Sequence, residues 1–167
     1  AHRLGYSPMS MTRAFDELER ADIGEHTAVG KERHLHFPEK GRRLWEMVLP
    51  YLTTPVRKRL YVSEAGKISG NLAGQSALAL YTMLSEPKNK VLAFSAEDWK
   101  VRTKSGEIKE IKYPEPGCLE IELWKYSPNL FAAEGKVDRL SLYLSLRDDR
   151  DERIQSALDA LLEEMEW

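Results

Sequence analysis

The clearest pattern of apolar and polar positions lies near the start of the chain. Met11, Phe15 and Leu18 recur at intervals of four and three residues, which places them on one face of a helix. Ser7 is a favourable N-cap, and the proline after it suits the first helical position, where no amide hydrogen is needed. The pattern therefore predicts a helix that begins after Ser7 and ends near Asp22.

The segments around this helix complete a recognisable order. Residues 1–4 read as the end of an earlier helix, and Gly5 suits a tight turn because it tolerates positive φ. After the helix, two strands over residues 26–28 and 33–37 flank a glycine-containing loop, residues 29–32, which is typical of a hairpin. Helix, turn, capped helix and hairpin are the order of a winged helix-turn-helix.

The exposed side of the predicted helix carries candidate contacts to double-stranded DNA. In a helix-turn-helix the N-terminal end of the second helix enters the major groove. There, Arg13 can bond to a guanine edge or a phosphate, hydroxyls can bond to either, and Met9 can contact a thymine methyl group. The predicted DNA-contacting residues are Ser7, Met9, Ser10, Thr12 and Arg13 in the helix and Lys31, Arg33 and His34 in the hairpin. The alternative is a surface helix whose polar face is merely solvated.

This segment resembles a known class of DNA-binding domains. The run LGYSPMSMTRAFDELERADI, the hairpin and the run FPEKGRRLWE resemble the winged-helix domains of multiple-antibiotic-resistance-type bacterial regulators. The matching positions are Leu4, Gly5, Ser7, Arg13, Leu18, Glu19, Lys40 and Gly41. Asp22 stands where the family often has glycine, and a helix that the family places before Ala1 is missing. The resemblance implies an N-terminally incomplete winged helix in a DNA-binding transcriptional regulator.

Composition and charge divide the chain. A helix is expected within residues 38–50, and a boundary near residues 51–55 separates a DNA-binding domain, 1–52, from a mixed α/β domain, 53–167, so the predicted class is α+β. Residues 1–60 hold eleven Lys and Arg against eight Asp and Glu, a net +3, and residues 61–167 hold fourteen against nineteen, a net −5. We expect the basic part to face DNA, and the modest excess favours a homodimer.

The second part shows alternating helical and strand patterns. We predict a buried helix over 75–84, strands over 60–62, 91–94, 108–113 and 119–124, a helical segment over 137–146 and a C-terminal helix capped by Asp149 or Asp151. The apolar stripe of that last helix is expected in the core and consists of Ile154, Leu158, Leu161, Leu162 and Met165. Glu120 and Glu122 are expected on the solvated face of a half-buried strand.

Candidate chemistry outside the DNA-like segment is sparse. The single cysteine, Cys118, excludes an internal disulfide and suits a buried position in a cytoplasmic protein, and no run of residues predicts a membrane span or a signal peptide. His34 and His36 share a strand face, but no further ligand completes a metal site. The basic triplet at residues 57–59 is either a phosphate contact or the flank of a strand. We predict neither a cofactor nor a metal.

Carboxylates and lysines at strand spacing raise an enzymatic alternative. Glu107 with Lys109, and Glu110 with Lys112, match the carboxylate-x-lysine end of a metal-dependent nuclease core. The same spacing arises from alternating charges on the solvated face of a strand. A nucleotidyltransferase site is not predicted at Glu120, Glu122 and Asp138, because no glycine-serine loop precedes these carboxylates. The sequence also shows no catalytic set of a serine, histidine or cysteine nucleophile with its base. We therefore expect no enzyme activity.

A second resemblance covers residues 54–167. The runs TPVRKRLYV, LAGQSALALYTML, LEIELWKYSP and VDRLSLYLSLRDDRDERIQSALDALLEEMEW resemble the domain behind the winged helix in abortive-infection-type antitoxin regulators. This resemblance implies repression of the protein's own operon and a protein toxin of nucleotidyltransferase type as partner. Three functions remain open: a transcriptional regulator, acting as a repressor, whose second domain dimerises or responds to an effector or partner; an antitoxin; and a DNA-acting enzyme.

Overall fold

The chain forms two compact units of mixed α/β structure. The computed structural model describes residues 6–30, 32–63, 68–104, 106 and 108–167. The first unit comprises Ala1–Leu52 with Glu166–Trp167, and the second comprises Thr53–Met165. The division falls at the boundary that we placed between residues 52 and 53, but the last two residues belong to the first unit.

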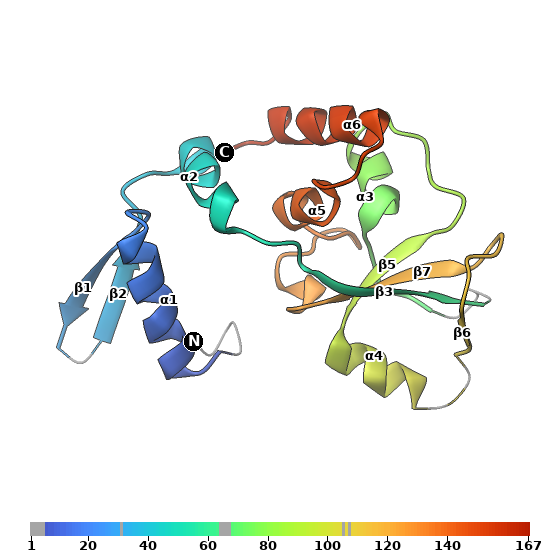
Figure 1. The fold of residues 1–167 in the computed structure, drawn as a ribbon, viewed down its shortest axis with the longest axis horizontal. Coiled ribbons are helices and arrows are strands. Elements are labelled where there is room, and N and C mark those ends of the chain that lie inside the picture. Colours follow the sequence, from blue (N-terminus) through green and yellow to red (C-terminus); the bar gives the residue numbers. More distant parts are fainter. Residues whose placement is uncertain (1–5, 31, 64–67, 105, 107) are drawn as a thin grey trace. The chain divides into compact units, whose positions relative to one another are not determined.

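The first unit is a helix, a hairpin and a second helix (Figure 1). Its elements are α1 (Pro8–Arg20), β1 (Glu25–Val29), β2 (Glu32–His36), α2 (Gly41–Val48) and the short 3-10 helix η2 (Leu49–Tyr51). The helix expected after Ser7 and the antiparallel pairing of the two strands are confirmed. In α2 the buried side chain is Trp45, whereas Leu44, Met47 and Val48 are half-buried.

Helix α1 ends in a Schellman motif built on an aspartate. The amide of Ile23 donates to the carbonyl of Leu18 and the amide of Asp22 donates to that of Glu19, each at 3.0 Å. Asp22 has φ = 55°, the left-handed conformation that glycine usually supplies at this position. The departure from glycine noted in the sequence therefore leaves the helix end in place, with an L-residue in a strained region.

The hairpin turn is tighter than predicted. Val29 pairs with Glu32 in the β1–β2 register, so two residues connect the strands instead of the four that we expected. Gly30, the first of these two residues, has φ = 64°, as both common two-residue hairpin turns, types I′ and II′, require at that position. Lys31, one of the predicted DNA contacts, lies outside the described residues, as do the expected helical end at residues 1–4 and the glycine turn.

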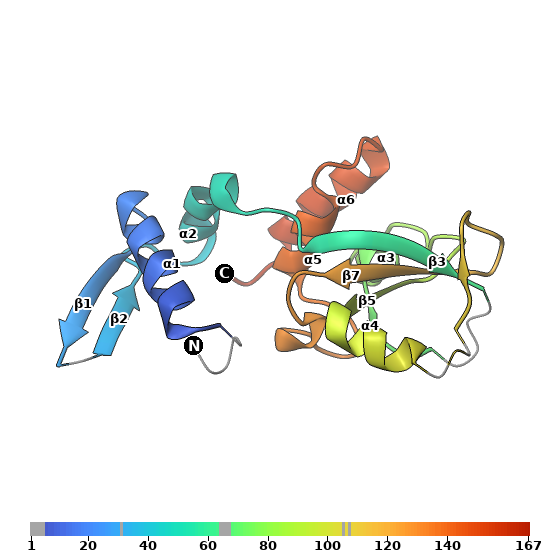
Figure 2. The same ribbon diagram turned by 60° about the horizontal axis from the view of Figure 1, so that its bottom comes forward.

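The second unit is a five-stranded sheet between helices (Figure 2). Its elements are β3 (Val56–Val62), β4 (Asn71–Leu72), α3 (Gly74–Tyr81), β5 (Val91–Ser95), α4 (Ala96–Thr103), β6 (Glu110–Ile111), β7 (Leu119–Trp124), η3 (Pro128–Leu130), α5 (Arg139–Leu146) and α6 (Glu152–Glu163). The strand order is β4-β5-β7-β3-β6. Only β5 and β7 pair in parallel among the described strands, and the segment that connects them contains α4.

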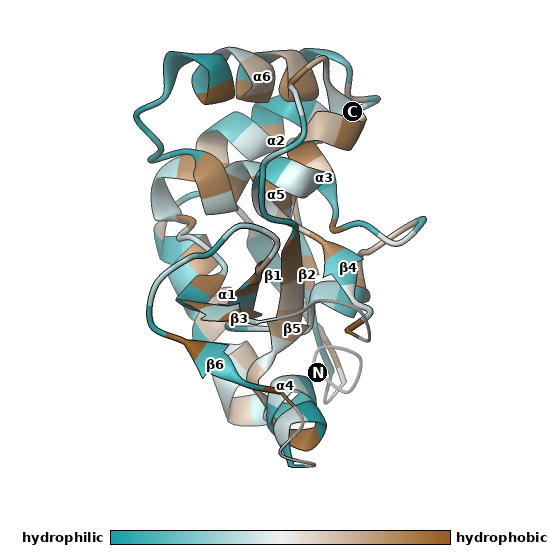
Figure 3. Cartoon of the chain, turned by 90° about the vertical axis from the view of Figure 1, so that its right-hand side faces the viewer, coloured by the Kyte–Doolittle hydropathy of each residue, from teal (hydrophilic) through white to brown (hydrophobic). Residues whose placement is uncertain are grey.

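Each face of this sheet is covered by helices (Figures 1 and 2). Val91, Ala93 and Trp124 pack with side chains of α3, α5 and α6 on one face. The alternate residues of β5, together with Ile121 of β7, pack with Trp99 of α4 on the other. Hydrophobic and hydrophilic bands alternate along α6 (Figure 3). The first four residues of β5 are apolar and buried. Three residues of the predicted C-terminal stripe are buried, and Leu162 and Met165 are half-buried.

The burial of β7 corrects the half-buried strand predicted from its alternating pattern. Glu122 is only 1% exposed, and Glu120 is half-buried. The reason is topological, because β7 lies between β5 and β3 and both faces of the sheet carry helices. The alternating pattern indicates which side chains of β7 are apolar. It does not indicate that helices also cover the face that carries the glutamates.

Other boundaries differ from the predictions. The first strand of the second unit starts at Val56, so the basic triplet lies inside a strand that we had expected over residues 60–62. Helix α3 ends at Tyr81, and Leu80 and Met83 are exposed, which contradicts a helix buried all round. The strand expected over 108–113 shrinks to two residues, and helix α4 was not predicted. Asp151, not Asp149, caps α6.

Candidate nucleic-acid interface

The N-terminal half of α1 presents its polar side to solvent. The Ser7 hydroxyl accepts a hydrogen bond from the Ser10 amide at 3.1 Å, which satisfies one of the free amides at the helix start. Met9 is 66% exposed, and Thr12 and Arg13 are also exposed. Five of the eight predicted DNA-contacting residues are therefore gathered on one exposed surface, which we call the α1 tip: Ser7, Met9, Ser10, Thr12 and Arg13.

The charge along α1 is uneven. Between Tyr6 and Phe15 the sequence has one cation, Arg13, and no carboxylate, whereas three carboxylates follow between Asp16 and Glu19. The helix macrodipole adds partial positive charge at the N-terminal end. The Arg13 guanidinium has one weak contact, with the Met9 sulfur at 3.8 Å. The α1 tip is thus locally positive, and Arg13 is able to reach an external acceptor.

The hairpin is held against α1 by two polar contacts. Arg33 Nη2 of β2 lies 2.7 Å from Asp16 Oδ1, and its guanidinium lies 5.9 Å from the centre of the Phe15 ring. The hydrogen bond from Arg33 lowers the pKa of Asp16 below its usual range. His26 Nδ1 of β1 lies 2.8 Å from Glu19 Oε1, an ion pair when the imidazole is protonated. Both contacts join α1 to the hairpin. The ribbon shows the hairpin strands beside this helix (Figure 2).

Arg33, one of the predicted DNA contacts in the hairpin, has a partner inside the unit. Its side chain is half-buried and paired with Asp16, and the residue lies within β2 and not in the hairpin turn. His34 is exposed, 3.7 Å from Glu32. Asp16 follows Thr12 and Arg13 by four and three positions, so it adjoins them on the same helix face. Sequence reasoning missed Asp16 as a partner because 17 positions separate it from Arg33.

The net charge of the first unit corrects the expectation that the DNA-like part is basic. Residues 1–52 contain eight Lys and Arg and eight Asp and Glu, and Glu166 of the same unit adds one carboxylate, so the formal net charge of the unit is −1. The excess of three found for residues 1–60 comes entirely from Arg57, Lys58 and Arg59, which belong to β3 of the second unit. Any attraction of the first unit to phosphate therefore arises from local charge separation and not from net charge.

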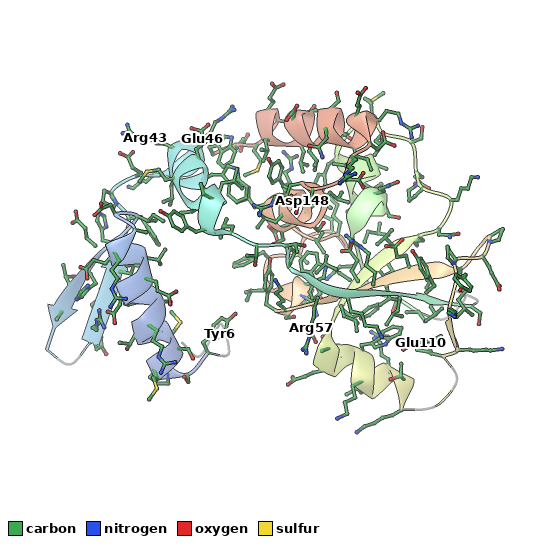
Figure 4. All side chains as sticks on the ribbon, viewed as in Figure 1. Tyr6, Arg43, Glu46, Arg57, Glu110 and Asp148 are labelled. Atoms are coloured by element: carbon green, nitrogen blue, oxygen red, sulfur yellow. The ribbon has the colours of Figure 1, made fainter. Side chains whose placement is uncertain are left out.

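Helix α2 carries two more arginines on its surface. Arg42 Nε lies 3.0 Å from Glu46, and Arg43 Nε lies 3.2 Å from Glu39. Arg43 and Glu46 project outward from the helix (Figure 4). Exposed pairs of this kind contribute little to stability, about 0.3–0.5 kcal/mol, so they exchange readily for other partners.

The residues of the alternative chemistries are placed only in part by the structure. Among the described residues, no group of three His, Cys, Asp or Glu side chains converges as a metal site would require. Asp138 caps α5 by accepting from the Ser141 amide at 2.9 Å. Cys118 is free and buried, as predicted. Glu107 lies outside the described residues, and of the second carboxylate-lysine pair only Glu110 falls within β6.

No described helix combines the length and apolar character needed to cross a membrane. Comparison with protein-family models, with curated proteins and with solved structures finds no match for this chain.

Proposed function

We propose that the first unit binds duplex DNA by inserting the α1 tip into the major groove, and that the protein is a transcriptional regulator that acts as a repressor. The observation that carries the proposal is the α1 tip itself. It is an exposed, capped helix end with hydroxyls, one arginine in weak contact with Met9 and no carboxylate, as a helix that reads base edges needs.

The hairpin supports the proposal through its fixed position. A wing contributes to recognition only when it is held at a defined angle to the reading helix, because both must meet the duplex at once. The Asp16–Arg33 bond and the Glu19–His26 contact supply that constraint. In this proposal the exposed His34 and the hairpin turn contact the phosphate backbone of the DNA. Arg33 acts as a positioning residue for the hairpin.

The first unit has no net positive charge, which predicts weak DNA binding by a single copy. With few cations to displace counterions, the affinity should fall only slowly with salt concentration. Specific regulators overcome weak half-site binding by pairing, so we propose that the protein acts as a homodimer on an inverted repeat. A dimer would place two α1 tips about one helical turn apart, roughly 34–36 Å along the duplex.

The direct test is selection of bound fragments from random duplex DNA, with the full chain at a stated salt concentration. We expect enrichment of an inverted repeat. Replacement of Arg13 by Ala should then weaken binding by about 1–3 kcal/mol and relax one base position. Arg20→Ala removes an exposed arginine from the last turn of the same helix and should change binding little. Failure to enrich any sequence, or equal effects of the two variants, would overturn the proposal.

A double-mutant cycle separates the positioning role of Arg33 from a phosphate contact. If Arg33 positions the hairpin, then Arg33→Ala, Asp16→Ala and the double variant should lose the same fraction of specificity, because each breaks one shared bond. If Arg33 holds a phosphate, Arg33→Ala should weaken binding whereas Asp16→Ala should strengthen it. The quantity to compare is the ratio of specific to non-specific affinity.

A further inference from the structure

The second unit contains a polar cavity of about 580 Å³ on the α3/α5 face of its sheet. The register pairs Arg59 with Glu122 and Tyr61 with Glu120, so these four side chains share that face of β3 and β7. The start of α3 and the end of α5 form further walls. The volume lies within the roughly 300–1,000 Å³ range of small-molecule sites.

One carboxylate at the base of the cavity has a full set of partners. Glu122 Oε1 accepts from Nε and Nη2 of Arg59 at 3.2 and 3.0 Å, and Oε2 accepts from Trp124 Nε1 at 3.0 Å. Arg59 Nη2 also donates to the Ser145 carbonyl at 3.1 Å. These bonds explain how a carboxylate that is only 1% exposed is tolerated, since buried charges require paired and hydrogen-bonded partners.

The second carboxylate, Glu120, shares its cationic partner with Glu122. Glu120 Oε1 lies 3.4 Å from Arg59 Nε, whose charge is already shared with Glu122. Two carboxylates thus face one guanidinium, and the cluster holds a net charge of −1. Burial raises the pKa of Glu120, and the charge of Glu120 raises the pKa of Tyr61. Both directions fit a negative charge that lacks a full counterpart in a partly dry site.

No other described residue of the lining forms an ion pair with Glu120. Of the residues that line the cavity, Asp148 and Asp149 are acidic, and Lys88 is the one cation besides Arg59. Asp148 follows α5 (Figure 4). Pro87, Pro114 and Val91 provide apolar surface. No group of three metal-binding side chains converges within the described residues, which favours an organic cation over a divalent metal.

We propose that this cavity binds a small organic cation, an amine or guanidinium on a short apolar body, with its charged head on Glu120 and its body against the apolar wall. The Glu120 carboxylate would then gain the second cationic partner that Glu122 already has. The site lies within the second unit, and the proposal does not depend on DNA binding by the first.

The test uses n-butylguanidinium and its neutral isostere n-butylurea, titrated calorimetrically into the full chain. We expect saturable binding of one n-butylguanidinium per chain and none of n-butylurea at the same concentrations. Glu120→Gln keeps the shape of the side chain and removes its charge, so it should weaken binding by about tenfold or more. Asp159→Asn, an exposed carboxylate on α6 outside the cavity, is the matched control and should leave binding unchanged.

Three results would overturn the proposal. Equal binding of n-butylurea would show that charge is not recognised. Equal weakening by Glu120→Gln and Asp159→Asn would show general attraction to an acidic protein. Stoichiometric Mg²⁺ binding that competes with n-butylguanidinium would make the cavity a metal site. Thermal unfolding of the Glu120→Gln chain without ligand at a temperature no lower than that of the parent chain would exclude a folding defect as the cause of any loss.

Discussion

The two units are stabilised in different ways. In the second unit, the buried residues form two apolar clusters, one on each face of the sheet. In the described part of the first unit, only Ile23, Gly24 and Trp45 are buried, and α1 has no fully buried residue. The first unit depends instead on helix caps, a Schellman motif and polar pairs. Its side chains are left at the surface, where a partner can use them.

This difference in packing gives the two units different kinds of surface for binding. A short helix and a two-stranded hairpin are only marginally stable by themselves. The helix caps and the polar pairs should therefore decide whether the first unit stays folded. A sheet covered on both faces leaves little surface for recognition except at cavities. The macromolecular interface that we propose therefore belongs to the first unit, and the small-ligand site that we propose belongs to the second.

The largest expected effect tests the core itself. Leu158→Ala, at a fully buried position of α6, should destabilise the second unit by about 2–5 kcal/mol because of lost contacts and a residual cavity. Leu18→Ala, the matched change on half-buried α1, should cost the first unit about half as much. Segment-resolved hydrogen exchange reports each unit separately. Equal losses would mean that the first unit is as well packed as the second.

The next effect tests the polar base of the cavity. Glu122→Ala leaves the Trp124 indole N–H without its acceptor and should cost the second unit about 1–3 kcal/mol in urea unfolding. Glu163→Ala, an exposed position at the end of α6, should stay within about 0.5 kcal/mol of the parent chain. A negligible loss for Glu122→Ala would show that the Arg59–Glu122 network does not stabilise the sheet.

The cap of α1 should have an effect near 1 kcal/mol. Ser7→Ala removes the acceptor for the Ser10 amide and should destabilise the first unit by about 1 kcal/mol, with faster exchange in the first turn of α1. Ser7→Asp should restore the cap. Unchanged exchange in Ser7→Ala would mean that tertiary contacts, and not the cap, hold the start of the helix.

Replacing a residue with positive φ by glycine should have a smaller effect on stability, and it should stabilise the unit where the changes above destabilise it. Asp22→Gly relieves an L-residue at φ = 55° and should stabilise the first unit by up to about 1 kcal/mol, part of the gain being offset by the flexibility of unfolded glycine. Glu134 has φ = 52° in the second unit and offers a matched change, Glu134→Gly, although that change also removes an exposed bond to Lys136. Destabilisation by Asp22→Gly would show that the aspartate side chain stabilises the turn.

The pH dependence at Glu120 is the smallest expected effect. Its pKa is raised above the ordinary value of 4.5, so the native state binds this proton more tightly than the unfolded chain does. The associated stability is fully present below about pH 4.5, the unfolded value, and is lost as pH rises through the folded value. Glu120→Gln should therefore gain stability relative to the parent chain as pH rises through this window, measured by urea unfolding. A constant difference would contradict the raised pKa.

Several elements were predictable because their signals are local. Ser7 with its proline, the alternation in β7 and the stripe of α6 depend on neighbouring positions, and each produced the expected element. The missed helix α4 also had such a signal. Ser95 caps it by accepting from the Asp98 amide at 3.1 Å, and the spacing of these two residues resembles a capping box.

By itself, the amino-acid sequence determined where most helices and strands form, which face of each is apolar and which residues make up the α1 tip, because these depend on residues within one or two turns of each other. The tertiary structure alone decided the partners of charged side chains. Arg33 meets Asp16 across 17 positions and Arg59 meets Glu122 across 63. Such pairs form only when chain topology brings distant segments together. A local pattern therefore reads both arginines as unpaired cations, whereas the fold pairs Arg33 with a carboxylate of α1 and Arg59 with a buried carboxylate of β7.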